Sequence, residues 1–172
     1  MSILPIILLP DPVLRLKAAA VERVDADLLR LADDMLETMY AAPGIGLAAP
    51  QVNVSRRLIV LDVGGADSNE DERHPLVMIN PQIVRVGGEQ RVYEEGCLSI
   101  PDVKVEIERP VTIEVTFLDR EGKRQTRAAE GLLATAIQHE VDHLDGRLII
   151  DFLSRLKRDI VVRRFKKQAR TT

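Results

Sequence analysis

Two histidines four positions apart, His139 and His143, constrain the fold of this chain more than any other feature of the sequence. On an α-helix such positions lie on one face, so both imidazoles can bind the same metal ion. Glu140 follows the first histidine, where a glutamate can reach a water activated by the metal and act as general base. A catalytic metal also needs a third protein ligand and an open coordination position. The fold must therefore bring a third ligand to this helix.

The choice of third ligand is narrow. No Glu occurs after Glu140, and the remaining histidine, His74, lies in a polar segment (residues 68–74) that we expect to form an exposed loop. Three aspartates follow the helix, but none lies in a recognisable ligand motif: Asp145, Asp151 and Asp159.

Cys97, the single cysteine of the chain, is the best remaining candidate. A thiolate is a strong, soft ligand for zinc or ferrous iron, and the adjacent Gly96 lets the backbone approach a site closely. The alternative is an ordinary one, because a lone cysteine is more often a small buried apolar residue, and paired histidines occur by chance on many helices. Cys97 with His139 and His143 is the ligand set that we expect.

A second motif is Gly44-Ile-Gly-Leu-Ala-Ala-Pro-Gln51. It is not a phosphate-binding loop, since no Gly-Lys-Ser/Thr follows, and its spacing is wrong for a dinucleotide fingerprint. A turn that ends the preceding helix explains Pro43 and Gly44. It does not explain the glutamine that closes the segment.

Together these motifs resemble the signatures of the peptide deformylase family. The matching segments are Gly44–Gln51, Glu95-Gly-Cys-Leu-Ser99 and Gln138-His-Glu-Val-Asp-His143, with further similarity at residues 9–15 and 144–146. The resemblance covers nearly the whole chain. It implies a bacterial enzyme, or a processed organellar form, that removes the formyl group from formylmethionine of newly synthesised polypeptides and releases formate.

We expect one divalent metal ion per chain, natively Fe²⁺, held by Cys97, His139 and His143. The same ligands also accept Zn²⁺, Ni²⁺ or Co²⁺, and affinity order alone does not decide which metal is bound in a cell.

The other expected roles divide between catalysis and substrate binding. Glu140 moves protons, while the Gln51 amide and the Leu98 backbone N–H stabilise the oxyanion. The expected substrate-binding residues are Ile45, Gly46, Glu95, Gly96, Leu132, Thr135 and Ala136. The last three share a helical stripe with the two histidines. The spacing alone favours Leu132 and Ala136 as ordinary core, whereas the resemblance implies that the first side chain of the substrate packs against this stripe.

The patterns predict an α+β fold, with antiparallel sheets packed around a central metal-binding helix and a C-terminal amphipathic helix. All 172 residues form a single catalytic domain in this prediction. Expected helices cover residues 25–42 with Asp25 as N-cap, about 131–143, and about 152–170. Expected strands cover residues 57–63, 76–79, 103–107 and 111–117, with a further short strand after a turn at 119–122. Asp142 is expected to be structural, paired with Arg109.

The lone cysteine excludes an internal disulfide and fits a reducing compartment. No apolar run approaches the length of a membrane span, and the apolar N-terminus is short and broken by Pro5 and Pro10, unlike a signal peptide. We therefore expect a cytoplasmic protein, without a membrane or DNA partner.

Residues 154–172 carry eight Lys and Arg against one Asp, about +7, while the whole chain is −3, which leaves about −10 for the rest (−3 minus 7). A solvated basic face is the common fate of such a segment. Docking on a polyanion is the alternative, and the resemblance favours ribosomal RNA near the nascent-chain exit.

Two other functions stay open at this point. A metallopeptidase is disfavoured by the missing downstream ligand, and comparing unblocked with formylated peptides would distinguish it. A catalytically silent, ribosome-associated protein is disfavoured because Gln51, Cys97 and Glu140 are all present.

Overall fold

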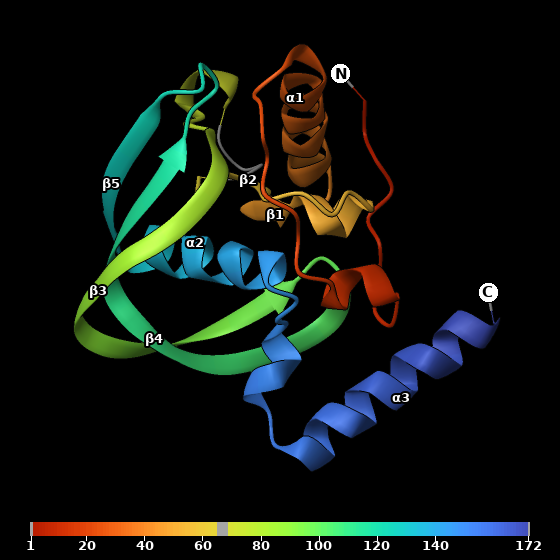
Figure 1. Cartoon of the computed structure of the whole chain (residues 1–172). Coiled ribbons are helices and arrows are strands. Elements are labelled where there is room, and N and C mark those ends of the chain that lie inside the picture. Colours follow the sequence, from red (N-terminus) through yellow and green to blue (C-terminus); the bar gives the residue numbers. More distant parts are fainter. Residues whose placement is uncertain (1, 65–68, 172) are drawn as a thin grey trace.

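The structure, a computed structural model, describes residues 2–64 and 69–171. Within them the helices are α1 (Ala26–Ala41), α2 (Gly131–Leu144) and α3 (Arg155–Thr171), with short 3-10 segments η1 (Pro12–Arg15), η2 (Ala49–Val52), η4 (Glu70–Glu72) and η5 (Ile149–Phe152). The strands are β1 (Gly46–Ala48), β2 (Leu58–Leu61), β3 (Leu76–Cys97), β4 (Ile100–Leu118) and β5 (Arg124–Glu130). They form an antiparallel sheet in the order β1-β2-β3-β4-β5, so the predicted α+β class is confirmed (Figure 1).

Strand β2 explains how the sheet carries a helix on each face. All four of its residues are buried, unlike the alternation of a half-buried strand. Leu58 and Val60 belong to the cluster around α1, and Ile59 and Leu61 belong to the cluster around α2. Successive side chains point to opposite faces. The sheet is therefore the central layer, with α1 on one side and α2 on the other (Figure 1).

Strands β3 and β4 are longer than the sequence predicts. The expected strand at 76–79 continues to Cys97, and the expected strands at 103–107 and 111–117 are parts of one strand, β4. The register of their pairing shifts at several points. For example, Gly87 pairs with Thr112, whereas Gln90 pairs with Pro110. Such bulges bend a strand and increase its twist, and the long ribbon curves around α2 (Figure 1).

The two core helices begin and end as their sequences indicate. The Asp25 side chain accepts a hydrogen bond from the Leu28 backbone N–H at 2.9 Å, so the predicted N-cap of α1 is confirmed. Burying Leu28 fully stabilises the fold by about 1.5–3 kcal/mol relative to exposure. After α2, Gly146 has φ 74°, and a Cβ there would lie 2.4 Å from the Arg15 carbonyl oxygen. Only glycine fits this helix end.

The C-terminal helix anticipated at about 152–170 is α3, which begins at Arg155, because residues up to Phe152 form η5 instead. Its buried anchor is Phe165, which packs with η5 and the start of β4 in a third cluster. Leu156 and Ile160, two apolar residues of this helix, remain exposed. In the part of the chain that the structure describes, no helix combines the length and apolarity needed to cross a membrane.

The polar segment before β3 contains the short helix η4, and the His74 side chain is exposed, as expected for a surface loop. Residues 65–68 of this segment lie outside the described residues.

Candidate active site

The three expected metal ligands come together from two elements. Cys97 ends β3, and His139 and His143 lie one turn apart on α2. Cys97 Sγ is 3.4 Å from His143 Nε2, and the ligand atoms of all three side chains lie within 4.8 Å of one another. The two imidazole centroids are 5.0 Å apart. This spacing allows one ion to contact the thiolate and both rings.

Each histidine keeps one ring nitrogen away from the ligand cluster. His139 Nδ1 is 3.0 Å from Glu95 Oε1, which leaves Nε2 for a metal. His143 is almost completely buried, and burial, together with the charges of His139 and Arg15, lowers its pKa well below the usual value. A neutral imidazole is the form that binds metal. Burial also lowers the pKa of His139, but Glu140, Cys97 and Glu95 outweigh it and raise that pKa overall.

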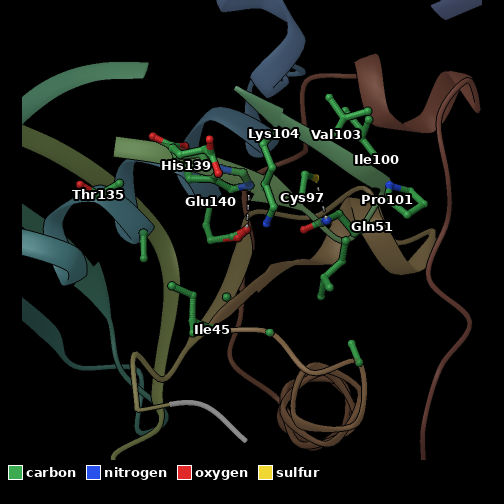
Figure 2. A pocket seen from close by; sticks show the side chains of 18 of the residues that line it. Ile45, Gln51, Cys97, Ile100, Pro101, Val103, Lys104, Thr135, His139 and Glu140 are labelled. Atoms are coloured by element: carbon green, nitrogen blue, oxygen red, sulfur yellow. Dashed lines mark hydrogen bonds and ion pairs between the residues drawn. The ribbon is translucent and has the colours of Figure 1, made fainter. Parts of the chain in front are cut away.

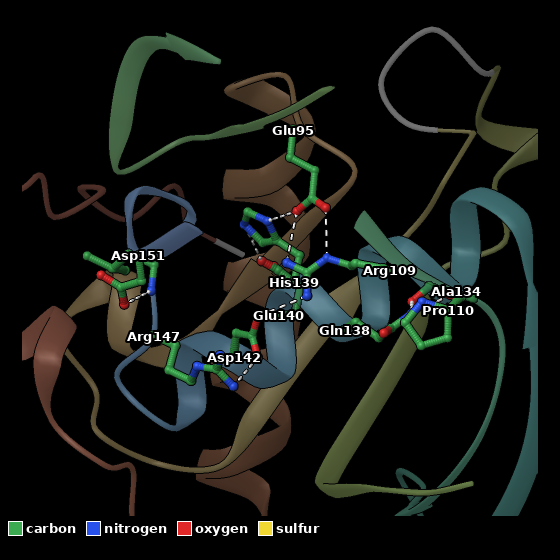
Figure 3. A network of polar contacts seen from close by, with 11 residues as sticks. Glu95, Arg109, Pro110, Ala134, Gln138, His139, Glu140, Asp142, Arg147 and Asp151 are labelled. Atoms are coloured by element: carbon green, nitrogen blue, oxygen red, sulfur yellow. Dashed lines mark hydrogen bonds and ion pairs between the residues drawn. The ribbon is translucent and has the colours of Figure 1, made fainter. Parts of the chain in front are cut away.

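Glu95 is held by a buried ion network that fixes its orientation (Figure 3). Arg109 donates from Nε and Nη2 to the two Glu95 oxygens at 2.7 and 3.1 Å, and from Nη1 to Asp142 Oδ2 at 3.0 Å. The expected pair of Asp142 and Arg109 is therefore confirmed. Burial raises the pKa of Glu95, but hydrogen bonds from His139 and Arg109 outweigh it and lower that pKa overall. Glu95 thus remains an anionic acceptor for the His139 ring.

Glu140 lies beside the ligands with one oxygen uncommitted. Its side chain is buried, and Oε2 has no hydrogen-bond partner among the described residues. Oε1 is 3.8 Å from His139 Nε2. Burial is the main cause that raises the Glu140 pKa to about 7. A carboxyl group with this pKa can both accept and release a proton near neutral pH.

Gly46 makes room for this carboxylate. A Cβ at Gly46 would lie 3.0 Å from Glu140 Cγ and 3.1 Å from Oε2. Gly96 shows a similar close approach on the opposite rim, where a Cβ would meet the Lys104 ammonium at 2.6 Å. Both glycines therefore let other side chains approach their backbone closely at the pocket.

The glutamine that closes the first motif is buried and oriented by three contacts. Gln51 Oε1 accepts from the Ala48 backbone N–H at 2.9 Å. Its Nε2 donates to Ser99 Oγ at 3.1 Å and points to Cys97 Sγ at 3.7 Å. The amide N–H groups thus face the ligand cluster (Figure 2). Leu98 follows Cys97 in the turn between β3 and β4.

A cavity of about 640 Å³ connects these groups. Its lining does not include His143 but includes the other expected site residues: Ile45, Gly46, Gln51, Glu95, Gly96, Cys97, Leu98, Leu132, Thr135, Ala136, His139 and Glu140. Thr135 and Ala136 are buried on α2, whereas Leu132 is 46% exposed and so is not ordinary core.

Sequence reasoning missed several features of this site. Arg109 was expected to bind Asp142 alone, and its two bonds to Glu95 join residues 14 positions apart that no local pattern connects. Ser99 and Lys104 were not singled out for the contacts described above. Two of the three aspartates after α2 have other partners, since Asp145 pairs with Arg57 and Asp151 with Arg15.

The residues present fit a catalytic divalent metal. One thiolate and two imidazoles form a three-ligand set of the kind that leaves a coordination position open. Glu140 lines the same cavity, and its buried Oε2 has no hydrogen-bond partner among the described residues.

Comparison with known proteins agrees with this geometry. The family model described as polypeptide deformylase matches residues 3–159. The chain belongs to the peptide deformylase family. A peptide deformylase of Rhizobium meliloti (strain 1021) is 61% identical over 171 residues, which cover 99% of this chain and 97% of that protein. The peptide deformylase of Agrobacterium fabrum is 57% identical over 170 residues, covering 99% and 98%.

Solved peptide deformylase structures share the fold. The crystal structure from Legionella pneumophila has a TM-score of 0.88 at 44% identity and covers 99% of this chain and 97% of its own. The Ehrlichia chaffeensis enzyme in complex with actinonin has a TM-score of 0.89 at 40% identity, covering 98% of each chain. The chain is therefore a metal-dependent hydrolase that removes the N-terminal formyl group from newly synthesised polypeptides. The metallopeptidase and the silent binding protein are set aside.

Proposed function

We propose the following roles for the residues of this deformylase site. Cys97, His139 and His143 hold one divalent metal ion, which supplies Lewis-acid chemistry by polarising the formyl carbonyl and acidifying a water. Glu140 is the general base and acid. The observation that carries this assignment is that Glu140 lines the cavity beside the ligand cluster while its buried Oε2 has no hydrogen-bond partner among the described residues.

In the proposed reaction, Glu140 accepts a proton from the attacking water and delivers it to the departing amine nitrogen. The formyl C–N bond breaks, and formate and a free amino terminus leave. Gln51 Nε2 and the Leu98 backbone N–H donate to the oxyanion, and one such donor is typically worth roughly 3–4 kcal/mol. Ser99 and Ala48 keep the Gln51 amide in this orientation.

The substrate lies in the cavity in the same proposal. The methionine side chain packs against Leu132, Thr135 and Ala136, beside the histidines on α2. The edge strand at Ile45 and Gly46 and the opposite backbone at Glu95 and Gly96 bind the extended peptide. Because β1 is at the edge of the sheet, the peptide can add as a further strand beside it.

Ferrous iron is our proposal for the native metal. The thiolate and imidazole ligands accept Fe²⁺, Zn²⁺, Ni²⁺ and Co²⁺. Elemental analysis of protein purified without oxygen would decide, and zinc as the only metal in that preparation would contradict iron.

The decisive test of the catalytic assignment is Glu140→Ala. We expect metal content to stay near one ion per chain while turnover of a formyl-methionyl tripeptide falls about 10²- to 10⁴-fold. Glu121→Ala removes a carboxylate that is 72% exposed in a distant turn and serves as the matched control. Loss of the metal in Glu140→Ala, or turnover near that of the control, would contradict the assignment.

We further propose that α3 docks the enzyme on ribosomal RNA in the cytoplasm, where formylated chains emerge. Its basic side chains at Arg163, Arg164, Lys166 and Lys167 are exposed, while Phe165 anchors the helix to the core. The four cations can therefore contact RNA phosphates while α3 stays folded and packed on the core. Binding of Lys and Arg to phosphates releases counterions and weakens steeply with salt.

Replacing those four residues by Gln should weaken co-sedimentation with ribosomes and leave hydrolysis of a short formylated peptide unchanged. The slope of log affinity against log salt should fall by about 3, because each phosphate contact contributes about 0.7–0.9. The control neutralises four exposed cations elsewhere: Arg85, Lys123, Arg124 and Arg127. Equal ribosome binding by the two variants would leave α3 as a solvated helix.

A further inference from the structure

A buried carboxylate outside the metal site lies directly behind the rim of the cavity. Asp62 follows β2 and is only 3% exposed. It accepts hydrogen bonds from the Tyr40 hydroxyl at 2.6 Å and from the backbone N–H groups of Gly64 and His74, both at 3.1 Å. The ion pairs found among the described residues do not include it, so these neutral donors replace its lost hydration. Buried carboxylates are costly, and this one is not needed for the proposed chemistry.

The position of Asp62 connects it to the cavity. Its own backbone N–H donates to the Ile45 carbonyl oxygen at 2.9 Å, which extends the β1–β2 pairing by one residue beyond Gly46 and Leu61. Ile45 and Gly46 line the cavity, and Gly46 lies against Glu140. Asp62 therefore holds the outer end of the edge strand through its main chain.

Tyr40 closes the same segment from the other side. It is the penultimate residue of α1, and residues 42–46, which follow, all line the cavity. The bond from Tyr40 to Asp62 thus joins the end of α1 to the residue that holds Ile45. Arg73 lies 4.0 Å from the centre of the Tyr40 ring and covers it. Burial and the bond to Asp62 raise the pKa of Tyr40, which keeps its proton on the hydroxyl.

We propose that Tyr40 and Asp62 are positioning residues for substrate binding: their hydrogen bond fixes the strand at Ile45 and Gly46 in the conformation that pairs with the formylated peptide. This inference rests on the proposed contact of that strand with substrate. Neither side chain lines the cavity, so both act through the backbone of the rim. Loosening the rim should weaken binding of the extended peptide more than it slows the chemical step.

Tyr40→Phe tests this, because it removes only the hydroxyl. The expected result with a formyl-methionyl tripeptide is a KM raised about three- to tenfold with kcat within about twofold of wild type, since the lost interaction is made through binding. Amide hydrogen exchange at residues 45–47 should become faster. Asp62→Asn, which loses the charge and one acceptor, should change KM in the same direction.

Thr38→Val is the matched control on the same helix. Thr38 is also buried, and its hydroxyl donates to the Asp34 carbonyl at 2.6 Å and accepts from the Leu4 backbone N–H, away from the rim. For Thr38→Val we expect a loss of thermal stability comparable to that of Tyr40→Phe. We expect no change in KM or in amide hydrogen exchange at residues 45–47. A Tyr40→Phe enzyme that behaves like this control, or whose kcat falls at constant KM, overturns the positioning role.

A formyl-methionyl tripeptide that is N-methylated at its second amide separates this inference from the proposed backbone contact, because it cannot donate that hydrogen bond to the rim. A raised KM for this substrate with wild-type enzyme, together with an unchanged KM for Tyr40→Phe, overturns the positioning role alone. An unchanged KM for the N-methylated substrate contradicts the backbone contact itself.

Discussion

The buried network around Arg109 predicts an unusually large effect of one substitution. Arg109→Met keeps the aliphatic stem but removes a guanidinium that makes hydrogen bonds of 2.7, 3.1 and 3.0 Å to Glu95 and Asp142. The side chains of Arg109 and Glu95 are each 7% exposed and that of Asp142 is 18% exposed. Two carboxylates would then face each other without their cation. Breaking a buried ion pair in this way typically costs about 3–5 kcal/mol.

Equilibrium unfolding in urea, with a chelator present, measures this loss without a contribution from metal affinity. The corresponding fall in melting temperature is roughly 6–20 °C for a chain of this size. Arg120→Met is the control, since its ion pair with Asp33 is 42% and 38% exposed. That surface pair should contribute less than about 1 kcal/mol.

A triple variant tests whether unpaired buried charge causes this loss of stability. Adding Glu95→Gln and Asp142→Asn to Arg109→Met removes the unpaired charges, and neutral replacement of a buried ion network is often close to neutral in stability. We therefore expect the triple variant to be more stable than the single one. If Arg109→Met costs no more than Arg120→Met, or if the triple variant recovers nothing, desolvated charge is not what makes Arg109 important.

Two further predictions concern the metal ligands and the ion pair between Arg15 and Asp151. Cys97→Ser should weaken metal retention against a chelator and reduce activity together, because a hydroxyl is a far poorer ligand than a thiolate; full metal content with full activity would contradict the three-ligand site. Asp151 binds Arg15 and the Leu148 backbone N–H, and although burial raises its pKa, these bonds lower the pKa overall. Its stabilisation is therefore present above its unfolded pKa and is lost as the pH falls through the folded one. Asp151→Asn should cost about 0.5–1 kcal/mol at pH 7, and urea unfolding should show the deficit shrinking as the pH falls below the ordinary aspartate pKa of about 3.9; a deficit that persists in strong acid would refute the charge argument.

The features that could be predicted from the sequence are those with a local cause. The Asp25 cap of α1 depends on neighbouring residues alone, and the structure confirms it. The metal ligands could be predicted for a different reason. The chain has one cysteine and three histidines, so few combinations of possible ligands exist.

The unpredicted features depend on contacts between distant segments. Strand β3 continues through residues 82–94, which are mostly exposed and carry no apolar alternation, because β4 pairs with it along this length. Arg109 reaches Glu95 across that pairing. Asp62 looks like the polar end of a strand, and only the fold brings Tyr40 to it. No periodicity in the sequence encodes such contacts.

The spacing of the two ligand motifs follows from the geometry of the elements that carry them. Glu95 and Cys97 are two residues apart at the end of β3, where the register of the pairing with β4 shifts. His139 and His143 are four residues apart on α2, a rise of about 6.0 Å along a helix. Glu95 contacts His139 while Cys97 contacts His143, so the spacing of the two strand residues matches one helical turn. A Cβ on Gly96, the residue between them, would meet Lys104. The strand motif and the helix motif are thus two halves of one contact, and a one-residue change in either spacing would break a ligand or its orienting hydrogen bond.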